Sequence, residues 1–147
     1  MTTKSPHLSI QAYLFFGGRC EEALQFYRTA LGAEILMLSR FKDAPEPQGL
    51  PDCFDEKVMH VSFRIGETIL MASDGRCEGE QNFDGFSLSL TVPDEAEADR
   101  MFAALSNGGL VSMPLRKTFW APKFGMVQDR FGVGWMVSVE HKPEQTR

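Results

Sequence analysis

Hydrophobic and polar residues alternate along two stretches of the chain, residues 8–16 and residues 86–92. The apolar positions are Leu8, Ile10, Ala12, Leu14 and Phe16 in the first stretch and Phe86, Leu88, Leu90 and Val92 in the second. A period of two is typical of a strand with one buried face. We therefore expect a strand near the start of each half of the chain, with these side chains in the core.

A helical pattern follows each of these strands. The apolar stripes are Cys20, Leu24, Tyr27 and Leu31 in the first half and Ala98, Met101, Phe102 and Leu105 in the second. This spacing predicts amphipathic helices. Gly32 and the pair Gly108-Gly109 are expected to end them, and Asp94 with Glu97 matches a capping box at the start of the second helix.

Further strand patterns complete each half. They lie at residues 35–41, 58–65 and 68–73, then at residues 110–115 and 125–128 and in the closing stretch 129–139. A two-residue turn at Gly66-Glu67 predicts a hairpin that pairs Ser62 with Met71 and His60 with Ser73. Strand, helix and three strands occur twice, which predicts an internal duplication of α+β class. We expect a single domain over residues 1–147, with modules at 8–74 and 86–140 and a linker at 75–85.

A long loop separates the second and third strands of the first module. Residues 42–57 contain three prolines, Pro45, Pro47 and Pro51. Loops of this length in compact domains are usually lids or mobile surface. The sequence therefore makes this segment a candidate gate or dimer contact.

Composition and charge narrow the class of protein. The 147 residues are 43% hydrophobic and 24% charged, and the formal net charge is −5. These values predict a globular cytoplasmic protein and argue against a nucleic-acid partner, which requires a basic face. No apolar run reaches the length of a membrane span, so no membrane partner is expected. Cys20, Cys53 and Cys77 form no C-x-x-C pattern and are expected to be reduced thiols.

Several motifs together resemble one known superfamily. They are the stretch Gln-Phe-Tyr-Arg-Thr-Ala-Leu-Gly-Ala at 25–33, His60-x-x-x-Arg64-Ile65, Met71-x-Ser73-Asp74, Thr-Phe-Trp-Ala at 118–121, and Asp-Arg-Phe-Gly-Val-Gly-Trp-Met at 129–136. With the duplication, they resemble the vicinal oxygen chelate superfamily of glyoxalases, bleomycin-resistance proteins and extradiol dioxygenases, and within it the PhnB-like branch. The resemblance implies two βαβββ modules whose curled mixed sheets surround a concave pocket, and a homodimer.

Members of that branch often carry the name demethylubiquinone methyltransferase. The sequence gives this name no support, because it has no glycine-rich strand-to-helix turn that could hold a methyl-donor nucleotide. Fold resemblance also does not carry a reaction type, since this scaffold hosts many chemistries.

The resemblance also implies where a divalent metal would bind. Metal enzymes of the superfamily place His, Gln or Glu ligands on the first and fourth strands of each module. If the apolar faces pack under the helices, the matching positions here are Gln11, Met71, Ser73, Ser87, Met136 and Ser138. Thioethers and hydroxyls are poor ligands for hard or borderline divalent ions, and only Gln11 is a ligand of the family type. We therefore expect neither a metal nor another cofactor; the alternative is a metal site built another way, for instance with His60 or Asp74.

Individual residues carry both a functional and a structural interpretation. His60 is the candidate catalytic base, oriented by polar neighbours, or it is simply a hydrogen-bonded structural residue. Arg64 is placed to bind an anionic group or to form a surface or dimer salt bridge. Trp120 and Phe124 would cover a ligand, or pack in the core or a dimer contact. Trp135 is expected to pack in the core.

Asp129 has two interpretations as well. It precedes a glycine-containing turn, which it is expected to cap, and a catalytic carboxylate is the lesser alternative.

Two functions follow as hypotheses. The first is metal-free binding of an unidentified small molecule in the concave pocket, and the second is a metal-dependent lyase, isomerase or dioxygenase that uses His60. A structural dimer partner without a ligand is a third alternative. The predicted ligand-binding residues are Gln11, Tyr13, Ser62, Arg64, Met71, Ser73, Ser87, Ser89, Trp120, Phe124 and Met136.

Overall fold

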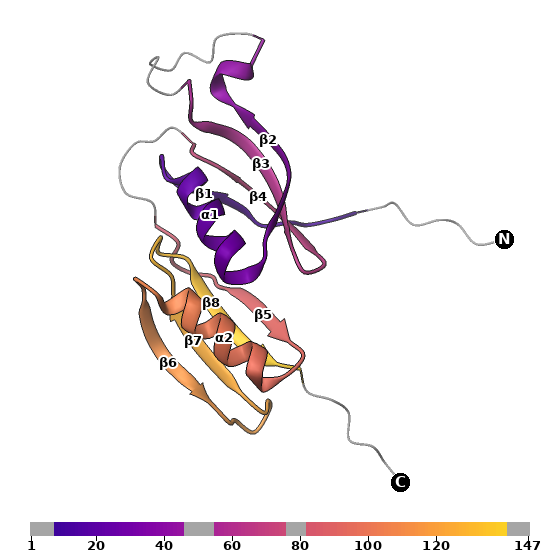
Figure 1. The fold of residues 1–147 in the computed structure, drawn as a ribbon, viewed down its shortest axis with the longest axis vertical. Coiled ribbons are helices and arrows are strands. Elements are labelled where there is room, and N and C mark those ends of the chain that lie inside the picture. Colours follow the sequence, from indigo (N-terminus) through magenta and orange to yellow (C-terminus); the bar gives the residue numbers. More distant parts are fainter. Residues whose placement is uncertain (1–7, 46–54, 76–81, 141–147) are drawn as a thin grey trace, which may run out of the picture. The chain divides into compact units, whose positions relative to one another are not determined.

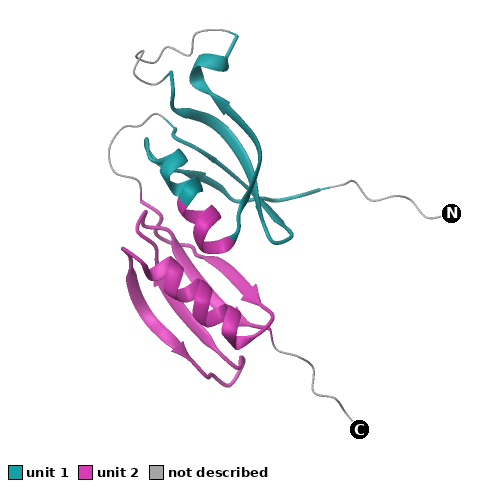
Figure 2. Cartoon of the chain, viewed as in Figure 1, with its two compact units in different colours: residues 1–25, 32–78 teal, residues 26–31, 79–147 magenta. Residues whose placement is uncertain are grey.

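The structure is a computed structural model that describes residues 8–45, 55–75 and 82–140. Its chain divides into two compact units (Figure 2). Unit 1 comprises residues 1–25 and 32–78, and unit 2 comprises residues 26–31 and 79–147. The boundary between the units falls within the first helix, whose residues 20–25 belong to unit 1 and residues 26–31 to unit 2.

The described elements occur in the order strand, helix and three strands, twice. They are β1 (Tyr13–Phe15), α1 (Cys20–Leu31), β2 (Glu34–Arg40), the short 3-10 helix η1 (Phe41–Asp43), β3 (Val58–Ile65), β4 (Thr68–Ser73), β5 (Leu88–Val92), α2 (Glu95–Ser106), β6 (Leu110–Arg116), β7 (Phe124–Gln128) and β8 (Gly134–Val139) (Figure 1). This order confirms the α+β class and the two βαβββ modules predicted from the sequence.

Both units contain a four-stranded mixed sheet of the same topology. The strand order is β1-β4-β3-β2 in unit 1 and β5-β8-β7-β6 in unit 2. In each sheet the first strand of the module runs parallel to the fourth, and the remaining pairs are antiparallel. The hairpin at Gly66-Glu67 is confirmed, because Ser62 pairs with Met71 and the ladder ends at Ile65 and Thr68. The predicted pairing of His60 with Ser73 is not part of this ladder, whose last pair is Val61 with Ala72.

Each sheet buries one face. In unit 1 the buried strand residues include Leu14, Val61, Phe63, Leu70 and Ala72. In unit 2 they include Val127, Trp135, Val137 and Val139, and α2 lies against this sheet with Ala98, Phe102 and Leu105 buried (Figure 1). Burial of apolar area is the main force that holds each layer in place.

Local signals set the helix ends. Asp94 is the N-cap of α2, and its Oδ1 accepts a hydrogen bond from the backbone N–H of Glu97 at 2.9 Å. The acceptor satisfies one of the free N–H groups in the first turn. Gly32 follows α1 with φ of 71°, a left-handed conformation that glycine adopts without steric cost. Both predicted ends are therefore confirmed.

The first predicted strand is wrong over residues 8–12. Only Tyr13–Phe15 form β1, and Leu8 and Ile10 are 83% and 99% exposed instead of buried. The register explains the short strand. Tyr13 pairs with Met71, so Leu8 would face Gly66 in the hairpin turn, where there is no strand to pair with.

Phe86 is a second correction, because it is 46% exposed and not part of the core. The strand begins only at Leu88, which pairs with Trp135. In that register Phe86 would face Val133, which precedes β8. Alternation in the sequence therefore continued past the end of the partner strand.

The turn that joins β1 to α1 contains two glycines, Gly17 and Gly18. Both glycines have positive φ, 60° and 103°. However, the first backbone N–H of α1 is already used, because Cys20 N donates to Asp74 Oδ1 at 2.8 Å. A carboxylate of the protein therefore occupies the anion-binding end of this helix.

Other expectations fall partly outside the described residues. The loop at 42–57 is described only at its two ends, and residues 46–54 lie outside. Cys53 and Cys77 lie outside as well, while Cys20 is a buried free thiol. No helix among the described residues is long and apolar enough to cross a membrane.

Candidate functional site

The open face of the unit 1 sheet brings together several predicted site residues. Tyr13 on β1 pairs with Met71 on β4, and Met71 pairs with Ser62 on β3. His60 is two residues before Ser62 and therefore on the same face of β3. All four side chains are partly or fully accessible, whereas the residues between them are buried. They form one continuous surface across three strands.

A hydrogen bond links Tyr13 to His60. The Tyr13 hydroxyl oxygen and His60 Nδ1 are 2.8 Å apart, and the two ring centroids are 5.5 Å apart. Either partner is able to donate, depending on the imidazole tautomer. In one case His60 presents Nε2–H as a donor, and in the other it presents a bare Nε2 as an acceptor or base. Burial first, and the Cys20 thiol next, raise the pKa of Tyr13, which keeps the phenol protonated at neutral pH.

Phe15 extends this surface, although it is not among the site residues predicted from the sequence. Its ring lies 5.0 Å from that of Tyr13 and is 48% exposed. A Cβ at Gly75 would lie 3.2 Å from Phe15 Cδ1, so the backbone there approaches the ring closely. The available signal was the alternation of β1, which puts Phe15 on the same face as Tyr13.

Two predicted residues of unit 1, Gln11 and Ser73, do not join this surface, and a third, Arg64, is engaged in an ion pair. Gln11 is exposed and precedes β1, so it is not on the strand where a ligand of the family type was expected. Arg64 forms a salt bridge with Glu34, as in its structural interpretation. Ser73 is 4% exposed, and its hydroxyl accepts from the Gly75 backbone N–H at 2.9 Å.

The open face of the unit 2 sheet carries two more predicted residues. Ser89 on β5 pairs with Met136 on β8, and Met136 pairs with Met126 on β7, which the sequence analysis did not select. Ser87 is exposed and lies just before β5. This face is made of thioethers and hydroxyls and is chemically unlike that of unit 1.

Trp120 and Phe124 lie together in unit 2. Their ring centroids are 5.3 Å apart, and Phe119 packs against Trp120 at 4.8 Å. Phe124 is buried at the first position of β7, not in the loop, whereas Trp120 is 48% exposed. Phe124 thus packs in the core, and Trp120 is half exposed.

Asp129 caps the turn before β8, as predicted. Its Oδ1 accepts from the backbone N–H groups of Phe131 at 2.8 Å and Val133 at 3.0 Å. Its Oδ2 accepts from the Tyr27 hydroxyl at 2.6 Å and from Trp135 Nε1 at 2.9 Å. The carboxylate is 3% exposed, so its four hydrogen bonds serve structure. Trp135 is buried, which confirms its packing role.

The described residues do not fit a divalent metal centre. They contain no group of three or more His, Cys, Asp or Glu side chains close enough to hold an ion. Of the proposed substitutes, Asp74 is engaged by two backbone N–H groups, and His60, whose Nδ1 bonds Tyr13, belongs to no such group of three. Met71, Met136 and the serines are poor ligands for hard divalent ions.

Known proteins show the same architecture. The structure of protein PA1353 from Pseudomonas aeruginosa matches with a TM-score of 0.82 and 45% sequence identity, covering 92% of this chain and 100% of that one. A putative 3-demethylubiquinone-9 3-methyltransferase, PhnB protein, from Bacillus cereus matches with a TM-score of 0.75 and 30% identity, over 90% and 100% of the two chains. A glyoxylase/bleomycin resistance protein/dioxygenase domain from Frankia sp. EAN1pec shares only the fold, at 15% identity, with a TM-score of 0.62 over 93% and 100%.

The chain therefore has the fold of the glyoxalase, bleomycin-resistance and dioxygenase superfamily. Protein YjdN of Escherichia coli K12 is 34% identical over 148 residues, which cover 94% of this chain and 100% of that protein. The family model described as 3-demethylubiquinone-9 3-methyltransferase matches residues 8–138. The chain belongs to this PhnB-like family.

Proposed function

We propose that the protein binds a small organic molecule on the open face of the unit 1 sheet, without the divalent metal that is usual in the superfamily. The observation that carries this proposal is the Tyr13–His60 hydrogen bond at 2.8 Å on an accessible sheet face. A polar pair among exposed rings is typical of sites in which a few polar groups orient a mainly apolar ligand.

The side chains of this face favour a flat ligand that carries an oxygen. Tyr13 and Phe15 offer adjacent rings 5.0 Å apart, against which a planar group packs well. Met71 adds a soft apolar contact, and the ring nitrogen of His60 that is free of Tyr13 offers one hydrogen bond. Catechol is a suitable probe, because it combines a flat ring with two hydroxyls.

Calorimetric titration of catechol into the full-length protein tests the proposal. Replacing Tyr13 with Phe keeps the ring but removes the hydroxyl that holds His60, so we expect catechol to bind about three- to tenfold more weakly, the effect of one hydrogen bond. Phe119→Leu is the matched control, since Phe119 is an exposed ring of unit 2. Equal affinity in wild type and Tyr13→Phe, or no saturable binding at all, would contradict the proposal.

Metal analysis tests the part of the proposal that excludes a divalent metal. The protein is purified without chelators and dialysed against Mn²⁺, Zn²⁺ and Ni²⁺, and bound metal is measured by mass spectrometry. The donor set predicts far less than one ion per chain. One tightly bound ion per chain would overturn the metal-free proposal.

The Tyr13–His60 pair also favours a second function, general-base catalysis. If Nδ1–H of His60 donates to Tyr13, Nε2 is free to accept a proton, as a general base of a lyase, isomerase or dioxygenase would. The test is turnover of a panel of oxo and catechol substrates, with and without added metal, by wild type and His60→Ala. An inactive wild type, or a variant with unchanged turnover, would remove His60 from a catalytic role.

The expected homodimer completes the proposal. Sedimentation of the full chain over a wide concentration range should give the mass of two chains. A single-chain mass throughout would contradict it.

A further inference from the structure

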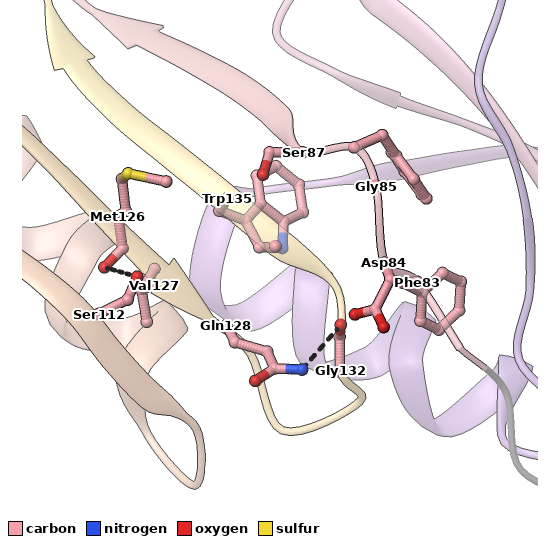
Figure 3. Close-up of a pocket in the computed structure, with 12 residues that line it drawn as sticks. Phe83, Asp84, Gly85, Ser87, Ser112, Met126, Val127, Gln128, Gly132 and Trp135 are labelled. Carbon is pink, nitrogen blue, oxygen red and sulfur yellow. Dashed lines mark hydrogen bonds between the residues drawn. The ribbon is translucent and has the colours of Figure 1, made fainter.

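We propose that unit 2 holds a second binding pocket, which accepts a monocyclic aromatic amine. The pocket has a volume of about 200 Å³ and lies beside the start of β5, the end of β7 and the start of β8 (Figure 3). None of its chemistry depends on the Tyr13–His60 pair, which belongs to unit 1. The proposed function and this site can therefore fail independently.

The size and walls of the pocket suit one aromatic ring. Its volume of about 200 Å³ exceeds that of a cavity of ~150 Å³ known to admit benzene. Phe83 and Phe86 line it, with ring centroids 6.4 Å apart in an edge-to-face arrangement. Phe86 is 46% exposed although it is a large apolar side chain, and a ligand ring packed on it would remove that exposed area from water.

Glycine keeps the pocket open on its β8 side. A Cβ on Gly134 would lie 3.0 Å from Ser87 Oγ, closer than an ordinary van der Waals contact. Gly134 does not have a positive φ, so its backbone conformation alone does not require glycine. The missing side chain therefore leaves room in the pocket, which gives a direct way to close it.

The polar groups of the pocket include two strong acceptors, the Asp84 carboxylate and the Gln128 side-chain oxygen. Gln128 donates one Nε2–H to the Gly132 carbonyl at 3.2 Å, which leaves Oε1 as an acceptor and the second Nε2–H as a donor (Figure 3). Asp84 contributes an exposed carboxylate, and Ser87 a hydroxyl. A ligand that donates hydrogen bonds and carries positive charge matches this set, because the carboxylate attracts it and the aromatic faces favour a cation.

Benzylamine is the probe, with benzoate, benzyl alcohol and cyclohexylmethylamine as matched compounds. Backbone amide signals of the ¹⁵N-labelled full chain are followed during titration. We expect benzylamine to shift residues 83–87 and 128–134 with a saturable curve, and benzoate to leave them unchanged at the same concentration. Cyclohexylmethylamine should bind more weakly than benzylamine, since it keeps the charge but lacks the aromatic ring. Equal shifts with benzoate, or shifts confined to other residues, would overturn the proposal.

Three variants, Gly134→Ala, Phe86→Leu and Asp84→Asn, test whether the ligand occupies this pocket. Gly134→Ala should abolish the saturable shifts while the circular dichroism and Tm stay close to wild type. Phe86→Leu should weaken binding about three- to tenfold, the effect of one aromatic contact, whereas Phe119→Leu should not.

Asp84→Asn should weaken the binding of benzylamine by about two- to fivefold, as expected for the loss of an exposed charge pair. It should not change the affinity for benzyl alcohol. Asp55→Asn, an exposed carboxylate of unit 1, is its control. If a folded Gly134→Ala variant binds benzylamine like wild type, the ligand does not occupy this pocket and the proposal is wrong.

Discussion

Among the residues that the structure describes, each unit buries one carboxylate, and the two carboxylates have different hydrogen-bond partners. Asp74 in unit 1 is 2% exposed and accepts from two backbone N–H groups, Cys20 and Val58, each at 2.8 Å. Asp129 in unit 2 is 3% exposed and accepts from its own turn and from the Tyr27 and Trp135 side chains. Asp74 therefore ties distant backbone segments, whereas Asp129 organises a turn and two aromatic side chains.

This difference shows what an internal duplication preserves. The strand order is the same in both sheets, but the buried polar contacts and the open faces are not. Tyr13 and His60 on one open face have no chemical counterpart in Ser89 and Met136 on the other. The shared fold of the two units therefore indicates similar packing but not similar chemistry. The function of each unit depends on its own side chains.

Asp129→Ala should give the largest loss of stability. It removes all four acceptor contacts, two with backbone N–H groups and two with the Tyr27 hydroxyl and the Trp135 N–H, at a cost of about 3–5 kcal/mol in the free energy of unfolding. Urea unfolding followed by circular dichroism measures it. Asp84→Ala, an exposed carboxylate of the same unit, is the control and should change stability by less than about 0.5 kcal/mol. Equal effects of the two variants would show that the Asp129 contacts do not stabilise unit 2.

Asp74→Ala should cost about 2–3 kcal/mol, since it removes the acceptor of two backbone N–H groups, compared with four donors for Asp129. Native-state hydrogen exchange gives a specific signature. The amides of Cys20 and Val58 should lose protection more than their neighbours do. Unchanged protection at both amides would contradict the contacts assigned to Asp74.

Tyr27→Phe should have a smaller effect, about 1–2 kcal/mol, because only the hydroxyl that donates to Asp129 is lost. A double-mutant cycle with Asp129→Asn separates this contact from the packing of the ring. The two substitutions should be clearly less costly together than the sum of their separate effects. Simple additivity would mean that the two side chains do not interact.

Cys20 provides the smallest test, one of reactivity and not of stability. Burial first, then the negative charges of Asp74 and Glu21, raise the pKa of this thiol, so little thiolate exists at pH 8. In a Cys53→Ser, Cys77→Ser background, iodoacetamide should not modify the native protein but should modify it in urea. Adding Asp74→Ala removes one of the charges, lowers the pKa of Cys20 and should speed its modification. Rapid modification of the native parent would contradict the buried position.

Local patterns in the sequence predicted much of the fold. The helix ends at Gly32 and Asp94, the hairpin at Gly66-Glu67 and the turn capped by Asp129 all depend on residues a few positions apart. The strand limits at residues 8–12 and at Phe86 were wrong because they depend on where the partner strand ends.

The same contrast holds for the candidate site, where patterns within one strand were predictable from the sequence and contacts between distant segments were not. Alternation selected Tyr13, His60, Ser62 and Met71, because it assigns residues to a face. It gave no sign that Tyr13 and His60, which are 47 positions apart, share a hydrogen bond. It likewise gave no sign that Tyr27 reaches Asp129 across 102 positions, since both contacts depend on tertiary packing.

The most direct test of the proposed function is an NMR titration of catechol that observes the imidazole nitrogens of His60. The account predicts that the His60 resonances move along a saturable curve, and that Tyr13→Phe both displaces them in the free protein and weakens the curve. Saturation by catechol without movement of His60, or an identical curve in Tyr13→Phe, would contradict it.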